Sequence, residues 1–185
     1  MPGNPSLHEC SKEVQGEFLD AASLLEQGKV LSMPLSRNLS SIFHGLHELR
    51  FKDRGGQVRF FYFIKKGDAI YLLHAMKKKT RELILRRSRR FEMAWKETSF
   101  EKLAKSLGVN PAEVREKQKL IELIAEARKD KGISQAILAK KLGVSQGRIA
   151  QIESGVGTAK VSFDVLLNVL RELGFDFKIV PKRVA

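Results

Sequence analysis

Hydrophobic positions in the first half of the chain change from a helical to a strand-like spacing. Between Val14 and Leu25 apolar residues recur every three or four positions, with Ser11 before them and Gly28 after them. This pattern predicts an amphipathic helix. Three apolar runs with alternating polar positions follow, and short turn-forming sequences separate them, which predicts an antiparallel meander. The first half is therefore expected to be an α+β module. The predicted strands are residues 46–51, 58–64 and 69–76.

The second half shows only helical spacing until its last residues. Capping residues and glycines divide it into helices, with a short one after Thr98 and a long one from Pro111 to Lys131. Residues 175–179 then alternate as a strand that has no partner within an otherwise all-α domain, and an unpaired strand edge is a liability. Three further helices are predicted to begin at Ser134, Ser145 and Ser162.

Residues 134–153 combine the features of two helices that cross at close range. Ala139 is small where the helices touch, and Gly143 permits the turn between them. In such a pair the start of the second helix enters a major groove of DNA, where Gln pairs with adenine and Arg with guanine. The expected shared core is Leu138, Leu142, Val144, Ile149 and Ile152, and the expected DNA-binding residues at the start of the second helix are Ser145, Gln146, Gly147, Arg148 and Gln151.

This stretch resembles the Xre/Cro family of phage repressors and antitoxins, including Gln135 and the closing Ile-Glu-Ser-Gly at 152–155. The resemblance implies that Gln135 contacts phosphate and that the start of the second helix reads bases. It also implies that the strand at 175–179 pairs with its twin to form a homodimer on a palindromic operator. Gly147 departs from the pattern, since it weakens the second helix and removes one possible base-reading side chain.

The three strand-like runs of the first half carry basic residues at matching places. These runs contain the sequences Leu-His-Glu-Leu-Arg-Phe from 46, Val-Arg-Phe-Phe-Tyr-Phe from 58 and Leu-Leu-His-Ala-Met-Lys-Lys-Lys-Thr from 72. These basic residues are Arg50, Arg59, Lys77 and Lys78. The same runs contain Tyr62 and His74, and His74 in an apolar strand is typical of a core histidine.

Residues 11–90 resemble the RelE/ParE superfamily, most closely its phage-derived HigB branch. The resemblance implies a RelE-like fold and, for members that are toxins, cleavage of mRNA on the ribosome without a metal. The 2′-hydroxyl attacks the adjacent phosphate, and cations gathered on one sheet face would stabilise the charge that develops there. By position, the resemblance implies that the candidate catalytic residues are Arg50, Arg59, Lys77 and Lys78, with Tyr62 and His74 as weaker candidates. Two departures bear on activity. The usual strand before the helix is missing or replaced by residues 1–9, and the usual terminal helix is shortened into the basic run 86–90.

Charge and cysteine content narrow the class of protein further. The chain has 34 Lys and Arg against 21 Asp and Glu, a net charge of +13. Residues 1–92 hold 17 basic and 10 acidic residues (+7) and residues 93–185 hold 17 and 11 (+6), so both halves favour a polyanionic partner. The single Cys10 leaves no disulfide and no thiol cluster for zinc. We therefore expect a cytoplasmic, cofactor-free and metal-free protein with no membrane segment.

Together these patterns predict a toxin–antitoxin fusion, with a HigB-like module at 1–92 and a HigA-like helix-turn-helix domain at 93–185. One hypothesis is an autorepressor that binds double-stranded operator DNA and whose toxin half is neutralised or inactive. A second is an active mRNA endoribonuclease restrained by the attached domain. A third is a general RNA-binding protein whose basic sheet never was a nuclease.

Overall fold

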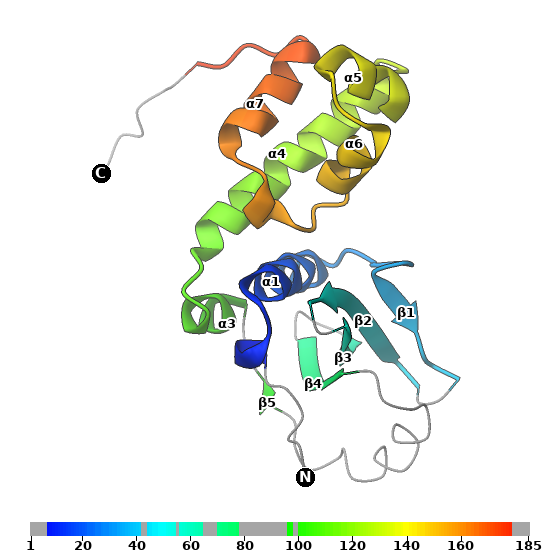
Figure 1. The fold of residues 1–185 in the computed structure, drawn as a ribbon, viewed down its shortest axis with the longest axis vertical. Coiled ribbons are helices and arrows are strands. Elements are labelled where there is room, and N and C mark those ends of the chain that lie inside the picture. Colours follow the sequence, from blue (N-terminus) through cyan, green and yellow to red (C-terminus); the bar gives the residue numbers. More distant parts are fainter. Residues whose placement is uncertain are drawn as a thin grey trace. The chain divides into compact units, whose positions relative to one another are not determined.

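The structure is a computed structural model that describes residues 7–41, 44–54, 56–64, 70–77, 96–97 and 100–178 (Figure 1). The chain divides into two compact units, Met1–Arg115 and Glu116–Ala185. Among the described residues, no helix has the length and apolar character needed to cross a membrane.

The first unit begins with a single long helix whose ends follow the sequence signals. Helix α1 spans Lys12–Glu26 and comes after a short 3-10 turn, η1, at Leu7–Glu9. The Ser11 hydroxyl accepts a hydrogen bond from the Val14 amide at 3.3 Å, which satisfies one of the free N–H groups at a helix start. Gly28 follows the helix with a φ of 76°, a left-handed conformation that glycine adopts without strain. The predicted helix is therefore confirmed.

An antiparallel sheet follows α1, and its strands lie in sequence order from β1 to β5. The three predicted strands are present and form the centre of this meander. The edge strands β1 and β5 were not predicted, because two or three residues are too few to show an alternating pattern. The strand bounds are Ser36–Asn38 (β1), Leu46–Asp53 (β2), Gly56–Ile64 (β3), Ile70–Lys77 (β4) and Lys96–Glu97 (β5).

Helix α1 packs against one face of the sheet. The Phe18 ring lies 6.1 Å from the Phe51 ring and 4.6 Å from the Phe60 ring, measured between centroids. Burying an aromatic side chain of this size contributes about 1.5–3 kcal/mol. Helix α3, Phe100–Ser106, adds Phe100 and Ala104 to the same core. The compact unit thus continues beyond residue 92, and the predicted module boundary at residue 93 lies outside the described residues.

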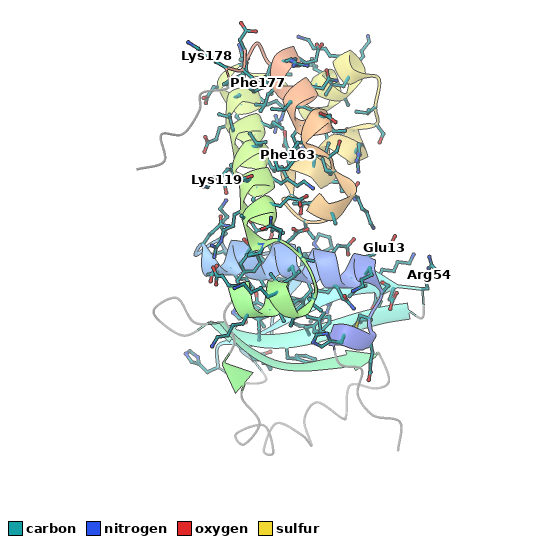
Figure 2. The ribbon with its side chains drawn as sticks, turned by 90° about the vertical axis from the view of Figure 1, so that its left-hand side faces the viewer. Glu13, Arg54, Lys119, Phe163, Phe177 and Lys178 are labelled. Atoms are coloured by element: carbon teal, nitrogen blue, oxygen red, sulfur yellow. The ribbon has the colours of Figure 1, made fainter. Side chains whose placement is uncertain are left out.

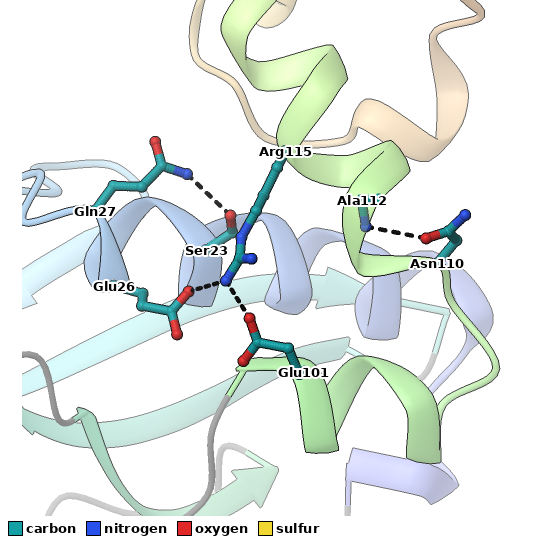
Figure 3. Close-up of polar contacts among 7 residues, drawn as sticks. All are labelled: Ser23, Glu26, Gln27, Glu101, Asn110, Ala112 and Arg115. Carbon is teal, nitrogen blue, oxygen red and sulfur yellow. Dashed lines mark hydrogen bonds and ion pairs between the residues drawn. The ribbon is translucent and has the colours of Figure 1, made fainter. Parts of the chain in front are cut away.

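The start of helix α4, Pro111–Asp130, completes the first unit. The Asn110 side chain accepts a hydrogen bond from the Ala112 amide at 3.0 Å, as a capping residue does. One turn later, the Arg115 guanidinium donates to Glu26 at 2.7 Å and also to Glu101 (Figure 3). These contacts connect α1 and α3 with the N-terminal part of α4, so the helix begins as part of the first unit.

The second unit is all-helical in its described residues. The hydroxyls of Ser134, Ser145 and Ser162 each accept a hydrogen bond from the amide three residues later, as predicted for N-caps. Gly143 ends α5 in a left-handed conformation with a φ of 67°. After α4 the elements are α5 (Gln135–Leu142), α6 (Gln146–Glu153), η3 (Thr158–Lys160) and α7 (Phe163–Glu172).

The core of the second unit matches the prediction except at the turn. Leu138, Ile149 and Ile152 are buried, and Leu142 packs against them half-buried. Val144 was predicted to join them, but its side chain is 42% exposed. This prediction was wrong because Val144 lies just after the left-handed residue at which the chain changes direction, so it does not continue the buried face of α5.

The predicted C-terminal strand is not present in its described part. Residues 175–178 belong to no strand, and residue 179 lies outside the described residues. Phe175 packs against the core, and its amide donates to the Leu170 carbonyl at 3.0 Å. Phe177 is 40% exposed, with the Arg171 guanidinium 5.8 Å from its ring centre (Figure 2). A strand needs a neighbour to form its hydrogen-bond ladder, and the described helical unit supplies none.

Candidate functional site

The two helices of the motif meet as their small residues predict. Helices α5 and α6 pack through Ala139, which is 3% exposed, and Ile149, which is 1% exposed. Because Ala139 has only a methyl group, the two backbones approach closely at this point. The chain passes from α5 to α6 through Gly143, whose conformation other residues rarely adopt. The sequence therefore builds a helix-turn-helix.

The beginning of α6 presents polar side chains to solvent. Ser145, Gln146, Gly147 and Gln151 are exposed, and Arg148 is half-buried. This is the end of the helix that the sequence predicts to read bases. Its N-terminus also carries a partial positive charge, which favours a nearby phosphate. These predicted DNA-binding residues are thus brought together on one surface of the second unit.

Arg148 and Gln151 are oriented by each other. The Arg148 guanidinium donates through one terminal nitrogen to the Gln151 side-chain oxygen at 3.0 Å and through the other to the Lys160 carbonyl at 3.3 Å. These bonds lie at an exposed surface, where water competes with them, so each contributes little net stability. Arg148 can exchange them for an acceptor on a base or a phosphate.

Gln135 is placed by a buried ion pair that the sequence did not reveal. Its side-chain amide donates to Glu153 at 2.8 Å. Arg128 in turn donates to the two Glu153 carboxylate oxygens, from Nε at 2.5 Å and from Nη2 at 2.8 Å. Its Nη1 atom donates to the Ile133 carbonyl. An amide nitrogen has two hydrogens, so Gln135 retains one that this contact with Glu153 does not use. The available sequence signal was a basic residue within the apolar stripe of Ile121 and Ile124 on α4.

Opposing effects act on the pKa of the Glu153 carboxyl. Burial alone would raise it. The hydrogen bonds from Arg128 and Gln135, with the charges of Arg128 and Lys129, outweigh burial and hold the pKa below its ordinary value of 4.5. Glu153 is therefore a carboxylate at neutral pH, which keeps both of its partners in place.

In the first unit, the sheet brings two of the four candidate catalytic residues together. Arg50 on β2 is in register with Arg59 on β3. Directly opposite residues in a sheet share a face, and alternation puts this face on the side away from Phe51 and Phe60, which pack under α1. Arg50 and Arg59 thus lie side by side on the sheet face that α1 does not cover.

A buried glutamate neutralises part of this arginine pair. Glu48 accepts from the Arg50 Nε and Nη2 atoms at 3.0 and 2.9 Å through one oxygen. Its other oxygen lies 2.7 Å from Arg59 Nη1. The Glu48 side chain is 2% exposed, against 21% for Arg50 and 22% for Arg59. The predicted cations are therefore held by a carboxylate that sequence reasoning did not include.

For the remaining candidates on β4, the structure gives the backbone register. Lys77 is in register with Val58 rather than with Arg59, whose partner on β4 is Met76. Lys78 lies outside the described residues, and His74 is in register with Phe61.

Tyr62 belongs to the opposite face, which explains why it is not part of the cluster. It is 1% exposed, its hydroxyl lies 2.9 Å from the Ser36 hydroxyl, and the His47 ring stacks 5.1 Å away. Burial raises the pKa of Tyr62, and the hydrogen bond with Ser36 acts against this rise. Tyr62 is thus a core residue that bonds to the edge strand β1.

Both units match known families. The family described as Phage derived protein Gp49-like matches residues 6–95, and a helix-turn-helix family matches residues 124–179. No curated protein and no solved structure matches the chain. The chain therefore consists of a Gp49-like domain, of the RelE/HigB-like toxin family, followed by an Xre-type helix-turn-helix domain. The resemblance predicted from the sequence is confirmed.

Proposed function

We propose that this protein is a toxin–antitoxin regulator that binds its own operator and represses transcription from the cytoplasm, with a RelE-like unit that is neutralised or inactive. The observation that carries the proposal is the capped start of α6, where Gln146 and Arg148 stand at a solvent-facing helix end. In this mode of binding, side chains at the helix start read base edges, and Gln135 contacts phosphate.

We propose further that the protein acts as a homodimer through residues 175–179. Phe177 is exposed in the single chain, and the described residues 176–178 are all exposed. Pairing of this segment with its twin would supply the missing ladder and bury Phe177. Deleting residues 175–185 is then expected to halve the mass in light scattering and to weaken operator binding, because two half-sites no longer act together. An unchanged mass places the interface elsewhere.

The direct test is binding to a duplex with two half-sites about one helical turn apart. Replacing Gln146 by Ala is expected to cost ~1–3 kcal/mol of binding at one base position. Gln57→Ala, an exposed glutamine on β3, is the matched control and leaves binding unchanged. If Gln146→Ala binds operator and random duplex as the parent does, α6 is not the recognition helix.

The second candidate function is ribosome-dependent mRNA cleavage restrained by the attached domain. The paired position of Arg50 and Arg59 favours it, since two guanidinium groups on one face can stabilise a phosphorane. In a translating extract, an active enzyme predicts mRNA cleavage by a fragment of residues 1–115, which retains the α3 and α4 contacts of the first core. Removing Arg59 is expected to cost ~2.7–4 kcal/mol of barrier. A folded fragment that binds RNA without cutting it supports the general RNA-binding alternative.

A further inference from the structure

The contact of Glu48 with two arginines on neighbouring strands is the least ordinary charge arrangement in the first unit. Like charges directly opposite in a sheet destabilise it, yet Arg50 and Arg59 are paired in register. A buried carboxylate is also unfavourable unless cations and hydrogen bonds compensate it. The Glu48 carboxylate therefore offsets the repulsion between the two arginines, and the arginines compensate the buried carboxylate.

Both oxygens of Glu48 face a guanidinium group, but hydrogen-bonding capacity is left over on the carboxylate and on the guanidinium side of the cluster. One Glu48 oxygen receives two donors from Arg50, and the other faces Arg59. The Arg59 Nε atom and the Glu48 oxygen that faces Arg59 are both shielded from solvent, and neither has a hydrogen-bond partner among the described residues. The three side chains together carry a charge of +1, because one carboxylate offsets one of two guanidinium groups.

We propose that Arg50 and Arg59 form a phosphate-binding site in which Glu48 acts as the internal counter-anion. Carboxylate and phosphate oxygens bind the same N–H groups of arginine with similar geometry, so Glu48 competes with an incoming phosphate. The side chains of Arg50 and Arg59 are 21% and 22% exposed, and such an anion approaches from their exposed side. The ligand chemistry is a phosphate oxyanion, supplied either by an RNA phosphodiester or by free phosphate.

This inference deepens the proposed inactivity of the RelE-like unit and gives it a physical cause. For an RNA phosphate at this site, the Glu48 carboxylate has already neutralised one of the two guanidinium charges. Replacing Glu48 by Gln keeps the shape of the side chain and one acceptor oxygen but removes the negative charge. The variant should therefore release both arginines to an external anion.

The test uses the full chain at constant ionic strength, with inorganic phosphate followed by calorimetry and a short single-stranded RNA followed by fluorescence anisotropy. Glu48→Gln is expected to bind phosphate about fivefold to tenfold more tightly than the parent, as for a charge-assisted contact regained. Glu13→Gln, in the exposed first turn of α1, changes the net charge equally and serves as the matched control (Figure 2).

Adding Arg59→Gln to Glu48→Gln is expected to abolish the gain. A parallel gain with RNA assigns the site to phosphodiesters, whereas a gain with inorganic phosphate alone assigns it to free phosphate. Either result supports the proposal. Equal binding by Glu48→Gln and Glu13→Gln, or a gain that survives the loss of Arg59, overturns it.

Glu48→Gln leaves two arginines unopposed, so its folding is measured by circular dichroism. If it is unfolded in chloride, the proposal expects phosphate to restore the fold, because a ligand stabilises the state that binds it. Phe60→Ala, a core variant of the same unit, controls for the general effect of the salt. No rescue, or equal rescue of both variants, overturns the proposal. Operator binding depends on α6 and is measured separately, so a failure here is distinct from a failure of the proposed function.

Discussion

Glu48 in the first unit and Glu153 in the second are both buried carboxylates paired with arginine, but they act differently on the surfaces around them. Glu153 binds Arg128 and Gln135, which places Gln135 while Gln146 and Gln151 stay exposed. Glu48 instead forms ion pairs with Arg50 and Arg59, two of the predicted catalytic residues. The ion pair in the second unit positions a residue of the proposed DNA-binding surface, and the one in the first unit lies within the proposed phosphate-binding site.

The difference shows that a basic residue in a predicted site can already be bound by a carboxylate of the protein itself. Desolvation makes an uncompensated buried charge unfavourable. Each buried carboxylate therefore limits whether its paired arginines can bind another anion. In the second unit the paired arginine is 11% exposed and lies apart from the exposed end of α6. In the first unit the paired arginines keep about twice that exposure. The same interaction is therefore structural in one unit and competes with a ligand in the other.

The largest expected effect is on the free energy of unfolding when a buried carboxylate loses an arginine partner. Replacing Arg128 by Met leaves Glu153 buried with only an amide partner, and should lower the free energy of unfolding of the second unit by ~3–5 kcal/mol. Replacing Arg59 by Met leaves Arg50 on Glu48 and should cost only ~1–2 kcal/mol. Native-state hydrogen exchange measures the two units separately.

The double variant Arg128→Met with Glu153→Leu is the control, since it removes the uncompensated charge and should recover most of the loss. An Arg59→Met effect equal to or greater than that of Arg128→Met contradicts this comparison.

A smaller effect is expected from protonating Glu153. Burial alone would raise the pKa of this carboxyl, but the bonds and charges of Arg128, Gln135 and Lys129 hold it below the unfolded value. A depressed pKa contributes stability that is present above the unfolded value and is lost as pH falls through the folded pKa. The protection factors for amide exchange in residues 116–178, which compare each rate with the intrinsic rate at the same pH, should therefore fall at acid pH. In Arg128→Met the acid-dependent part should be smaller, and an unchanged dependence argues against this assignment.

The caps of α6 and α7 offer a matched pair with an effect near 1 kcal/mol. Ser145→Ala and Ser162→Ala each remove one side-chain acceptor from a helix start and should each destabilise the second unit by ~1 kcal/mol. Only Ser145 lies at the proposed recognition end. We therefore expect similar thermal shifts from both variants, with loss of operator binding from Ser145→Ala alone. Equal binding losses would mean that the effect on DNA arises from stability.

The smallest effect is a stabilisation at Gly147. A β-carbon at this position would meet only the Ser145 hydroxyl, at 3.9 Å. Alanine is favoured over glycine inside a helix by ~0.8–1.0 kcal/mol, so Gly147→Ala should raise the free energy of unfolding by up to that amount. Gly143→Ala, where φ is 67°, is the contrasting variant and should destabilise the unit. A destabilising Gly147→Ala would show that the helix there is not regular.

Local signals predicted the helices and central strands well. Serine caps, terminal glycines and the spacing of apolar residues act within a few positions, and α1, α5, α6 and α7 begin where these signals place them. The central meander followed from alternation and hairpin turns in the same way. The register between Arg50 and Arg59 also agreed with the expectation that both lie on one face.

Interactions between distant positions could not be predicted. Arg128 and Glu153 are 25 residues apart, and nothing local joins them. Glu48 was part of the quoted motif, but its burial depends on the whole sheet. The register of Lys77 depends on an irregularity in the pairing of β3 with β4 between Phe61 and Tyr62, and a shift of one residue moves a side chain to the other face.

The most direct test of the account is selection of duplex DNA from a random pool by the full chain. We expect enrichment of a sequence with two similar half-sites about one helical turn apart, and loss of one specified base in each half-site when Gln146 is replaced by Ala. Glu48→Gln should select the same sequence as the parent, since its effect belongs to the first unit. Enrichment of no sequence, or of the same full sequence by Gln146→Ala, would contradict a regulator that reads DNA through α6.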